Sequence, residues 1–392
     1  MKFLLYSHFF APSIGGVETI VLSLARGLAG LRTANGAAEF ELTVATQTPA
    51  GDFDDRALPF RVVRQPGLVH LWGLIRAADV IHVAGPSLTP LSLSRLARKP
   101  VVIEHHGYQA ICLNGMLLHQ PDRSICPGHF QAGRYAECLR CNAHETSRPR
   151  SCAHLLLMFL RRALTRHVAA NLGISQHVLH RLAVPHSSVI YYGIDDPPRN
   201  TLPSQEPLSA SSKRICFAYV GRLVQEKGIP ILLQAAQKLM SEGHEFEVRL
   251  IGDGDERPML EAMIGREHLE SFVRITGYLT GAALADALRD VRVVVMPSIW
   301  EETAGLAVIE QMMRGRLVIV SDIGGLGEVV GEAGLKCAPG NADTLADRMR
   351  EVLRSPALID SFGQKARERA LRLFMQERMI EEHARVYRGM IG

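Results

Sequence analysis

The sequence predicts an α/β protein made of two Rossmann-like domains, each built on a doubly wound parallel sheet. Short runs rich in Val and Ile alternate with longer amphipathic stretches along most of the 392 residues. Such alternation is typical of parallel strands connected by helices. The alternation starts afresh after a polar stretch rich in Pro and Ser, 195–214, which we interpret as a linker. The length of the chain also favours two domains over a single core.

The first half opens with an apolar run, 2–10, that we interpret as a strand. It is not interpreted as a signal peptide, because no convincing cleavage site follows it. Residues 15–31 fit an amphipathic helix that carries Ile20, Leu24 and Leu28 on one face. The next strands are predicted at 40–47, 78–85 and 99–107.

The second half repeats this rhythm with five apolar runs. They lie at 214–223, 245–254, 272–279, 291–298 and 316–322. We predict an N-terminal domain at 1–195, a linker at 196–213, a C-terminal domain at 214–375 and a final helix at 376–392 that can pack back on the first domain. Because ligands bind outside the carboxyl ends of such strands, we expect the site in a cleft between the domains.

Composition limits the classes of partner. Hydrophobic residues make up 47% of the chain and the mean hydropathy is +0.06, which allows a large buried core. The net charge of +4 and the pI of about 8.7 are too weak to indicate a nucleic-acid binder. They suit an anionic ligand or an anionic membrane surface. No apolar run is long enough to span a bilayer, so we expect a cytoplasmic protein.

Five of the seven cysteines lie in an irregular insert, 108–152, that is rich in Cys and His. In a cytoplasmic protein such clustering favours metal binding or chance over disulfides. Only the stretch CLRC, 138–141, has the tight spacing of a zinc-binding pair. We predict a structural zinc on four cysteines: Cys112, Cys126, Cys138 and Cys141. Free buried thiols are the alternative, and other ligands can compete: His119, His129 and Cys152.

Two cations follow the first strand of the second half. The strand ends at Val220, Gly221 permits a turn, and Arg222 and Lys227 come next, five residues apart. At the mouth of a parallel sheet such a pair suits a diphosphate, because Arg offers a planar fork and Lys a point charge. A solvated basic loop is the alternative.

Three carboxylates surround a turn between two later strands. Glu301 and Glu302 precede Gly305, and Glu310 lies about one turn inside the helix that follows. Glycine lets a ligand approach the backbone closely, and the free amides at the start of a helix favour phosphate. Carboxylates accept hydrogen bonds from sugar hydroxyls. Glu301 is explained by the helix dipole alone, whereas Glu302 and Glu310 fit readers of hydroxyl groups.

In this order the motifs resemble glycosyltransferase family 4, retaining enzymes of the GT-B fold, of the type that assembles bacterial polysaccharide and lipid-linked glycans. In the second half they are GRLVQEKG (221–228), IGDGDERPMLE (251–261), ITGYL (275–279), the acids Glu302 and Glu310, and SDIGGLGEVV (321–330). In the first half they are HFFAPSIGGVE (8–18), DVIHVAGP (79–86), EHHG (104–107), NLGISQHVLHRL (171–182) and VIYYGIDD (189–196). The resemblance covers nearly the whole chain, and the ordered set is far more specific than any single motif.

The resemblance implies roles for the matching residues of the second half. Arg222 and Lys227 match the pair that holds the donor diphosphate. Glu302 matches the acid near the hydroxyls of the donor sugar, and Glu310 matches the acid on the nucleotide ribose. The residues implied in catalysis are His106, Glu302, Arg222 and Lys227.

Further implied contacts involve backbone and a histidine. Gly305 and Leu306 match the loop whose amides meet phosphate and sugar. Gly16, preceded by Gly15, matches the glycine of the first domain that faces the diphosphate. His106 matches the histidine near the transferred sugar, although a lone His at a strand end more often only caps a sheet.

The resemblance predicts transfer of a hexose-type sugar, with retention, from a nucleotide-diphosphate sugar to a glycan or lipid-linked acceptor. It implies no catalytic metal, since Arg and Lys neutralise the diphosphate. The sequence departs from the family at Tyr192, where Asn is common, and at ETAG (302–305), which lacks an aromatic residue. A GT-B epimerase or hydrolase of nucleotide sugars and a non-catalytic, zinc-stabilised scaffold are the alternatives. A dinucleotide oxidoreductase is disfavoured because no G-x-G-x-x-G follows the first strand.

The stretch 152–168 combines an apolar run with several basic residues. A buried core helix with a basic end is the simpler interpretation. The other interpretation is an interfacial helix that holds the protein at the inner face of a membrane.

Overall fold

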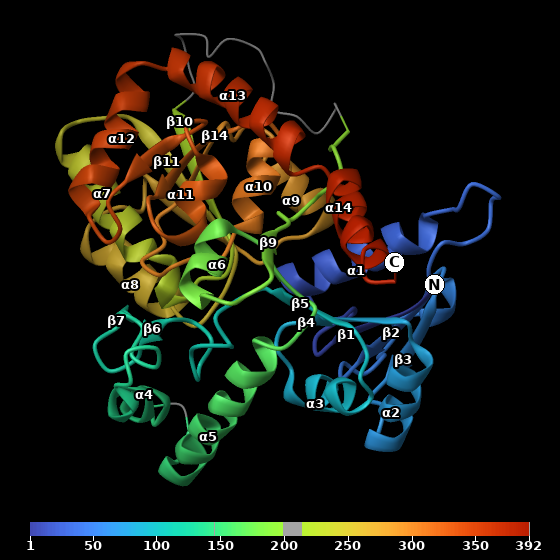
Figure 1. Cartoon of the computed structure of the whole chain (residues 1–392). Helices are drawn as coiled ribbons and strands as arrows, with labels where there is room; N and C mark the ends of the chain where they lie inside the picture. The colour runs from blue at the N-terminus through green and yellow to red at the C-terminus, as the bar shows by residue number, and fades with distance from the viewer. Residues whose placement is uncertain (145, 199–213, 392) are drawn as a thin grey trace. The chain divides into compact units, whose positions relative to one another are not determined.

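The computed structural model describes residues 1–144, 146–198 and 214–391. They form two compact units, one of Met1–Ile194 with Phe374–Gly392 and the other of Asp195–Leu373 (Figure 1). The predicted linker, 196–213, lies outside the described residues from 199 onward. Within the described part of the chain, no helix is both long and apolar enough to cross a bilayer.

The first unit is built on a parallel sheet, with seven strands among its described residues. In spatial order they are β3 (Arg61–Arg64), β2 (Glu41–Thr46), β1 (Lys2–Ser7), β4 (Val80–Ala84), β5 (Val101–His105), β8 (Ala170–Gly173) and β9 (Ser187–Val189). Its helices are α1 (Gly16–Gly30), η1 (Asp55–Ala57), α2 (Leu68–Ala77), α3 (Leu88–Leu96), α4 (Tyr135–Asn142), α5 (Arg148–Thr165), α6 (Gln176–Leu182) and α14 (Gln376–Arg388). A small antiparallel pair, β6 (Leu118–His119) and β7 (Ser124–Ile125), lies in the cysteine-rich insert.

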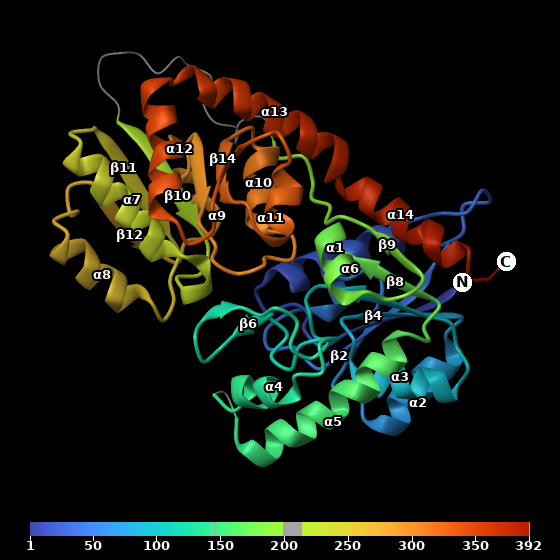
Figure 2. The same cartoon turned by 60° about the vertical axis from the view of Figure 1, so that its left-hand side comes forward.

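Alternate side chains of the central strands point to opposite faces of this sheet. On one face Ile81 and Ile103 form a core with residues of α2 and α3, and Leu164 of α5 packs against it (Figure 2). On the other face α14 lies beside α1, and the ring of Tyr387 packs on Phe3 with centroids 4.5 Å apart. Two structural layers therefore bury both sides of the apolar strands, as the continuous Val/Ile runs require.

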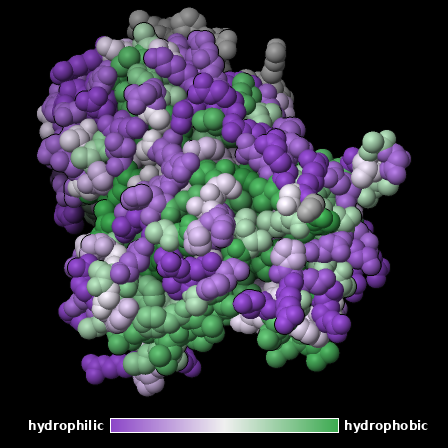
Figure 3. Space-filling view, in the orientation of Figure 1, coloured by the Kyte–Doolittle hydropathy of each residue, from purple (hydrophilic) through white to green (hydrophobic). Residues whose placement is uncertain are grey.

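The stretch 152–168 forms most of α5, but it is not a core helix. Met158 is fully buried, whereas the apolar side chains around it are exposed to between 43% and 71%. They are Leu156, Leu157, Phe159 and Leu160. The core interpretation of this stretch is therefore wrong, because the helix packs through only a narrow stripe. Its apolar side chains contribute to the green surface over α5 in Figure 3.

The second unit carries a parallel sheet of six described strands. In spatial order they are β12 (Val273–Gly277), β11 (Phe246–Ile251), β10 (Ile215–Val220), β13 (Val293–Met296), β14 (Leu317–Ser321) and β15 (Leu335–Cys337). The helices are η3 (Gln225–Lys227), α7 (Ile229–Ser241), α8 (Arg257–Arg266), α9 (Gly281–Ala287), α10 (Leu306–Met313), α11 (Gly324–Val330), α12 (Ala342–Arg354) and α13 (Ala357–Leu373).

Both strand orders are doubly wound, so the predicted fold class is confirmed. In each sheet the order reverses beside the first strand, between β1 and β4 in one unit and between β10 and β13 in the other. Loops that follow these strand pairs diverge to opposite sides of the sheet and leave a crevice. In the second unit this crevice is the place where the loops with Arg222, Lys227, Glu302 and Gly305 begin.

The two crevice loops of the second unit are joined by their backbones. The Ile299 amide donates to the carbonyl oxygen of Glu226 at 3.0 Å. Gly228 has a positive φ of 66°, and a Cβ there would overlap the carbonyl oxygen of Pro297. Only glycine meets both conditions, so the sequence GRLVQEKG places Lys227 directly against the second loop.

Candidate functional site

The centre of the candidate site is an ion pair between Lys227 and Glu302. The Lys227 ammonium contacts Oε1 of Glu302, and the Ser298 hydroxyl donates to the same oxygen at 2.8 Å. The ammonium also lies 5.7 Å from the ring centroid of Trp300. The structure thus brings together two residues that the sequence predicted separately, one for phosphate and one for a sugar.

The surroundings of Glu302 keep it ionised although only 6% of the residue is exposed. Burial alone would raise the pKa of this carboxyl group. The Lys227 charge and hydrogen bonds from Lys227 and Ser298 outweigh burial, and the pKa is lowered. A buried carboxylate that already accepts several hydrogen bonds is held in one orientation, as a binding group needs.

The loop that carries Glu302 rests on the start of α11. The Gly325 amide donates to the Glu302 carbonyl oxygen at 2.6 Å. A Cβ on Gly324 would overlap backbone atoms of Glu302, and one on Gly325 would overlap the carbonyl of Thr303. This support was missed by sequence reasoning, although the pair of glycines in SDIGGLGE is its signal.

The predicted phosphate position is the N-terminus of α10. Gly305 precedes this helix with a φ of 74°, and a Cβ there would overlap the Leu326 side chain. No side chain caps the helix start, so the first amides, beginning at Leu306, have no partner within the helix. One turn further, burial raises the pKa of Glu310, although Arg314 acts in the opposite direction.

The side chain of Arg222 is more exposed and less tightly paired than that of Lys227. Its side chain is 74% exposed, and its guanidinium lies 3.9 Å from Glu226. The turn before it is fixed, because the Tyr219 hydroxyl donates to the Arg222 carbonyl oxygen at 2.7 Å. The structure therefore anchors the backbone of Arg222 and leaves the guanidinium able to reach a ligand.

In the first unit, Gly15 and Gly16 lie at the start of α1, directly after the loop that follows β1. Gly15 is the residue before the helix and has extended backbone, and α1 has no side-chain cap there. The Glu18 side chain lies close enough that a Cβ on Gly15 would meet it. Gly15 and Gly16 thus lie at the switch point of the first sheet, where their diphosphate role stays a prediction.

His106 follows β5 and is held inside the first unit. Its side chain is 5% exposed, its Nδ1 lies 2.9 Å from the Tyr192 hydroxyl, and its Nε2 lies 3.4 Å from Oε2 of Glu104. Burial lowers the pKa of His106, although Glu104 opposes the shift. Tyr192, a departure from the family pattern, is thus a direct partner of this histidine. The role of His106 at a transferred sugar stays a prediction.

The four cysteines of the predicted zinc site surround one small cavity of about 20 Å³. Its lining includes Cys112, Cys126, Cys138, Cys141, His119 and His129. The Cys112 thiol donates to the Asn114 side chain at 2.9 Å, and Cys141 accepts from the Gln120 amide at 3.3 Å. Across 1–144, 146–198 and 214–391, no three or more Cys, His, Asp or Glu side chains are arranged to hold a metal ion.

The observed side-chain arrangement therefore does not fit zinc, although the fold gathers the four thiols. Cys152 is exposed and lines a different pocket, which makes it a poor rival ligand. His119 lines the cavity and holds Asp122 through Nδ1 at 2.8 Å, which leaves Nε2 as a rival ligand. Zinc on the four cysteines stays a prediction that needs the thiols to turn toward one point.

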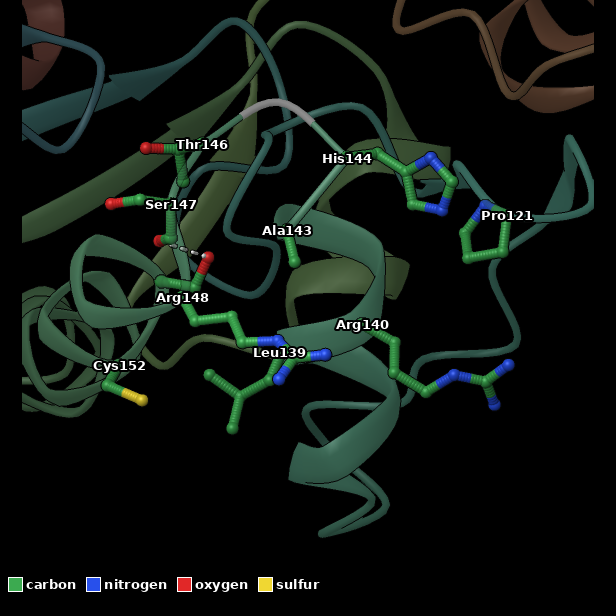
Figure 4. Close-up of a pocket in the computed structure, with 10 residues that line it drawn as sticks. Pro121, Leu139, Arg140, Ala143, His144, Thr146, Ser147, Arg148 and Cys152 are labelled. Atoms are coloured by element: carbon green, nitrogen blue, oxygen red, sulfur yellow. Dashed lines mark hydrogen bonds between the residues drawn. The ribbon is translucent and has the colours of Figure 1, made fainter.

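That second pocket, of about 720 Å³, lies between α4 and the start of α5. Figure 4 shows Arg140, Arg148, His144, Ser147 and Cys152 around it. None of the residues predicted for the donor lines this pocket. Its cations and hydroxyl groups are a second polar surface of the first unit.

Comparison with known proteins finds similarity over part of the chain. Residues 203–369 match the protein family described as Glycosyl transferases group 1. Alpha-D-kanosaminyltransferase of Streptomyces kanamyceticus is 31% identical over 150 residues, 38% of this chain and 39% of that protein. Glycogen synthase of Mycobacterium tuberculosis is 31% identical over 171 residues, 43% of this chain and 41% of that protein. The chain spans about two fifths of the length of these curated relatives. The predicted resemblance to glycosyltransferases is confirmed, while family 4 stays a prediction.

Solved structures extend the likeness of the fold to the whole chain. Anabaena HepE in complex with UDP-glucose has a TM-score of 0.72 at 17% identity, covering 99% of this chain and 100% of that one. Sucrose-phosphate synthase from Thermosynechococcus elongatus has a TM-score of 0.72 at 20% identity, covering 100% and 99%. The predicted GT-B fold is confirmed.

We predict that Lys227→Ala destabilises the second unit in a pH-dependent way. Without its partner the buried Glu302 charge should cost about 3 kcal/mol at pH 7. In the parent protein the lowered pKa of Glu302 contributes stability above the unfolded pKa, about 4.3, which is lost as pH falls through the folded value. In the variant burial raises this pKa, so acid neutralises Glu302 and the deficit shrinks. Urea unfolding at pH 7 and about pH 4 measures both.

The exposed Arg222→Ala is the matched control and should change stability by no more than about 0.5 kcal/mol. A Lys227→Ala deficit that stays constant with pH would show that Glu302 is not the buried charge responsible.

We also predict that iodoacetamide labels Cys152 well before the cavity cysteines. Cys152 is exposed, whereas burial raises the pKa of Cys112 to about 11 and that of Cys138 to about 12. Timed labelling and peptide mass spectrometry measure the order. If zinc binds, chelation before labelling should speed reaction at the four cavity cysteines and leave Cys152 unchanged. Equal rates with and without chelator, together with zinc-free purified protein, would contradict the zinc prediction.

Proposed function

We propose that this chain is a retaining glycosyltransferase of family 4 that moves a hexose from a nucleotide-diphosphate sugar to a glycan or lipid-linked acceptor. The observation that carries the proposal is the Lys227–Glu302 pair at the switch point of the second sheet, between exposed Arg222 and the N-terminus of α10. These groups combine two cations, free amides and an oriented carboxylate in loops at one sheet edge. That combination suits a ligand with both phosphate and hydroxyl groups.

The chemistry requires stabilisation of the leaving diphosphate. Breaking the bond between the sugar and the diphosphate leaves negative charge on the phosphate oxygens. Lys227 and the first amides of α10 supply preorganised positive charge and donors for these oxygens, and the exposed Arg222 guanidinium can move toward them. They replace the charge that a divalent ion supplies in other transferases, so the proposed mechanism has no catalytic metal. In the proposed retaining mechanism the acceptor attacks from the face that the phosphate leaves, and this phosphate takes the acceptor proton.

The two carboxylates divide the recognition of hydroxyl groups. Glu302 is ionised and fixed by Lys227 and Ser298, so its remaining acceptor capacity suits the hydroxyls of the donor sugar. Glu310 lies one turn into α10 and suits the ribose hydroxyls of the nucleotide. Burial raises the pKa of Glu310, and hydrogen bonds from ribose hydroxyls to its charged form would lower that pKa.

UDP-sugars are the donors to test first. The solved structure of HepE contains UDP-glucose, and relatives such as 2-deoxystreptamine glucosyltransferase of Streptomyces kanamyceticus, 35% identical over 143 residues, are named for sugar transfer. The relatives are named for different acceptors, so their names do not identify the acceptor of this chain. The first unit is the part of the chain that we propose binds the acceptor. The alternative of an epimerase or hydrolase predicts that the donor is consumed without any acceptor.

We predict that Arg222→Ala, Lys227→Ala and Glu302→Ala each lower sugar transfer by about a hundredfold, because each removes a group that meets charge or hydroxyls in the transition state. A panel of UDP- and GDP-sugars with glycan and lipid-linked acceptors, read by mass spectrometry, measures transfer. NMR of the product gives the anomeric configuration.

Lys238→Ala is the control, since Lys238 lies on α7 and pairs with Asp343 at a partly exposed position. Near-normal transfer by Lys227→Ala would overturn the site. Free sugar or an epimer formed without acceptor would favour the alternative, and an inverted product would overturn retention.

We further propose that the first unit docks on an anionic membrane surface, where a lipid-linked acceptor resides. The exposed apolar side chains of α5 adjoin exposed arginines at its start, Arg148 and Arg150. The helix α2, which carries exposed Leu68 and Val69, packs on the same core of the first sheet as α5. Apolar side chains flanked by cations suit the interface of an anionic bilayer. The pocket with Arg140 and Arg148 lies at the start of this helix and suits a phosphate of the acceptor.

We predict that the double variant Leu156→Ser/Phe159→Ser binds vesicles of phosphatidylcholine and phosphatidylglycerol about tenfold more weakly, because two inserted apolar side chains are lost. Vesicle co-sedimentation measures binding, and vesicles of phosphatidylcholine alone measure the charge contribution. Tyr278→Ser removes an equally exposed apolar side chain from the second unit and should leave binding unchanged. Absence of binding by the parent protein would overturn membrane docking.

A further inference from the structure

A buried carboxylate, Glu104, lies at the centre of three histidines in the first unit. It is 1% exposed and lies near the end of β5, two residues before His106. Nε2 of His82 and Nε2 of His106 each lie 3.4 Å from Oε2 of Glu104, and Nε2 of His383 lies 3.5 Å from Oε1. His82 belongs to β4 and His383 to α14, so the cluster joins three elements far apart in sequence.

The outer nitrogen of each ring has its own partner. Nδ1 of His106 lies 2.9 Å from the Tyr192 hydroxyl, and Nδ1 of His82 lies 2.8 Å from the Tyr387 hydroxyl. Nδ1 of His383 lies 2.8 Å from the Met379 carbonyl oxygen. Because a carbonyl only accepts, this nitrogen of His383 must carry a proton.

These partners fix the protons that face Glu104. A neutral His383 would point the lone pair of Nε2 at Oε1 of Glu104, 3.5 Å away, which is repulsive, so this placement favours a second proton on Nε2. That proton makes an ion pair and neutralises a charge that would be costly to bury alone. At His106 and His82 the phenol groups can donate to Nδ1, and the proton of each neutral ring then lies on Nε2, toward Glu104. A metal does not explain the cluster, since no such group among the described residues is arranged to hold one.

We propose that Glu104 is a positioning residue for His106. It holds the imidazole as the Nε2–H tautomer with Tyr192 on the opposite nitrogen, and His383 of α14 supplies the charge that keeps Glu104 ionised in the core. The part of this inference that concerns sugar transfer rests on the proposed function and on the role of His106 in it. The arrangement of the protons does not depend on that function.

The arrangement also gives the C-terminal helix a place in the cluster around Glu104 and His106. Tyr387 and His383 lie on the same face of α14, one turn apart, and both reach the Glu104 cluster. His383 of α14 thereby places a positive charge next to Glu104 at the end of β5. The first sheet and α14 therefore act together to orient His106, in addition to packing against each other.

The test combines imidazole NMR with kinetics of the full-length chain. With ¹⁵N-labelled histidine at neutral pH, we expect an imidazolium pattern for His383 and an Nε2–H pattern for His106 and His82. Glu104→Gln keeps the side-chain size but removes the charge, so His383 should become neutral and His106 should lose its single tautomer. In the transfer assay kcat should fall about tenfold or more with a smaller change in KM, because orientation rather than donor binding is lost.

Two further variants keep the inference falsifiable if Glu104→Gln does not fold. In Tyr192→Phe, Glu104 alone should still hold His106 as the Nε2–H tautomer; an Nδ1–H or mixed pattern would overturn the proposal. Tyr387→Phe should alter only the His82 signals and leave those of His106 unchanged.

The transfer assay tests the proposed function, and the NMR patterns test the role of Glu104 independently of it. If no nucleotide sugar is used by the parent protein, the proposed function fails, and the NMR patterns still decide the role of Glu104. Unchanged imidazole signals in Glu104→Gln would overturn the cluster. Changed signals with normal kcat and KM would overturn its role in positioning a catalytic group.

Discussion

The contact on which the candidate site depends is the ion pair between Lys227 and Glu302. A carboxylate as buried as Glu302 is costly unless it is paired and hydrogen-bonded. Its partner therefore has to come from the neighbouring loop, and Gly228 allows that loop to approach because no Cβ meets the Pro297 carbonyl. Gly324 and Gly325 support the same carboxylate loop from the other side. Gly228, Gly324 and Gly325 thus allow the close backbone contacts that the buried charge of Glu302 requires.

The same requirement recurs in the first unit with a different solution. Glu104 lies near the end of β5, one strand away from the switch point between β1 and β4, and no lysine among the described residues pairs with it. Three imidazoles surround it instead, and α14 brings one of them. Lysine gives Glu302 a fixed charge, whereas histidine can supply a charge or a neutral donor according to its second nitrogen. The pair of Lys227 and Glu302 suits a carboxylate that must stay charged close to phosphate. The histidine cluster suits a carboxylate, Glu104, that orients an imidazole ring.

The fold was predictable because its signals are local and repeated. Val/Ile-rich runs with the spacing of strands and helices define both sheets, and the strand order of doubly wound sheets then locates the loops with Arg222, Lys227, Glu302 and Gly305. Contacts between residues distant in sequence were not predictable in this way. His82, Glu104 and His383 carry no shared motif, and α14 brings His383 to the sheet only in the folded chain. The burial of α5 was predicted wrongly, because an apolar run gives the period of a helix but not the width of the face that a partner covers.

The division of charge between the two cations also follows from burial. Lys227 is committed to Glu302, so a phosphate that approaches it meets a dipole rather than a lone charge. Arg222 is exposed and lies 3.9 Å from Glu226, so under the proposed function it would supply most of the attraction that an incoming diphosphate meets first. Under the proposed function, sugar hydroxyls that occupy the oxygens of Glu302 would compete with Lys227 and strengthen it as a phosphate ligand. The pair would then couple recognition of the sugar to stabilisation of the leaving group, which neither residue would achieve alone.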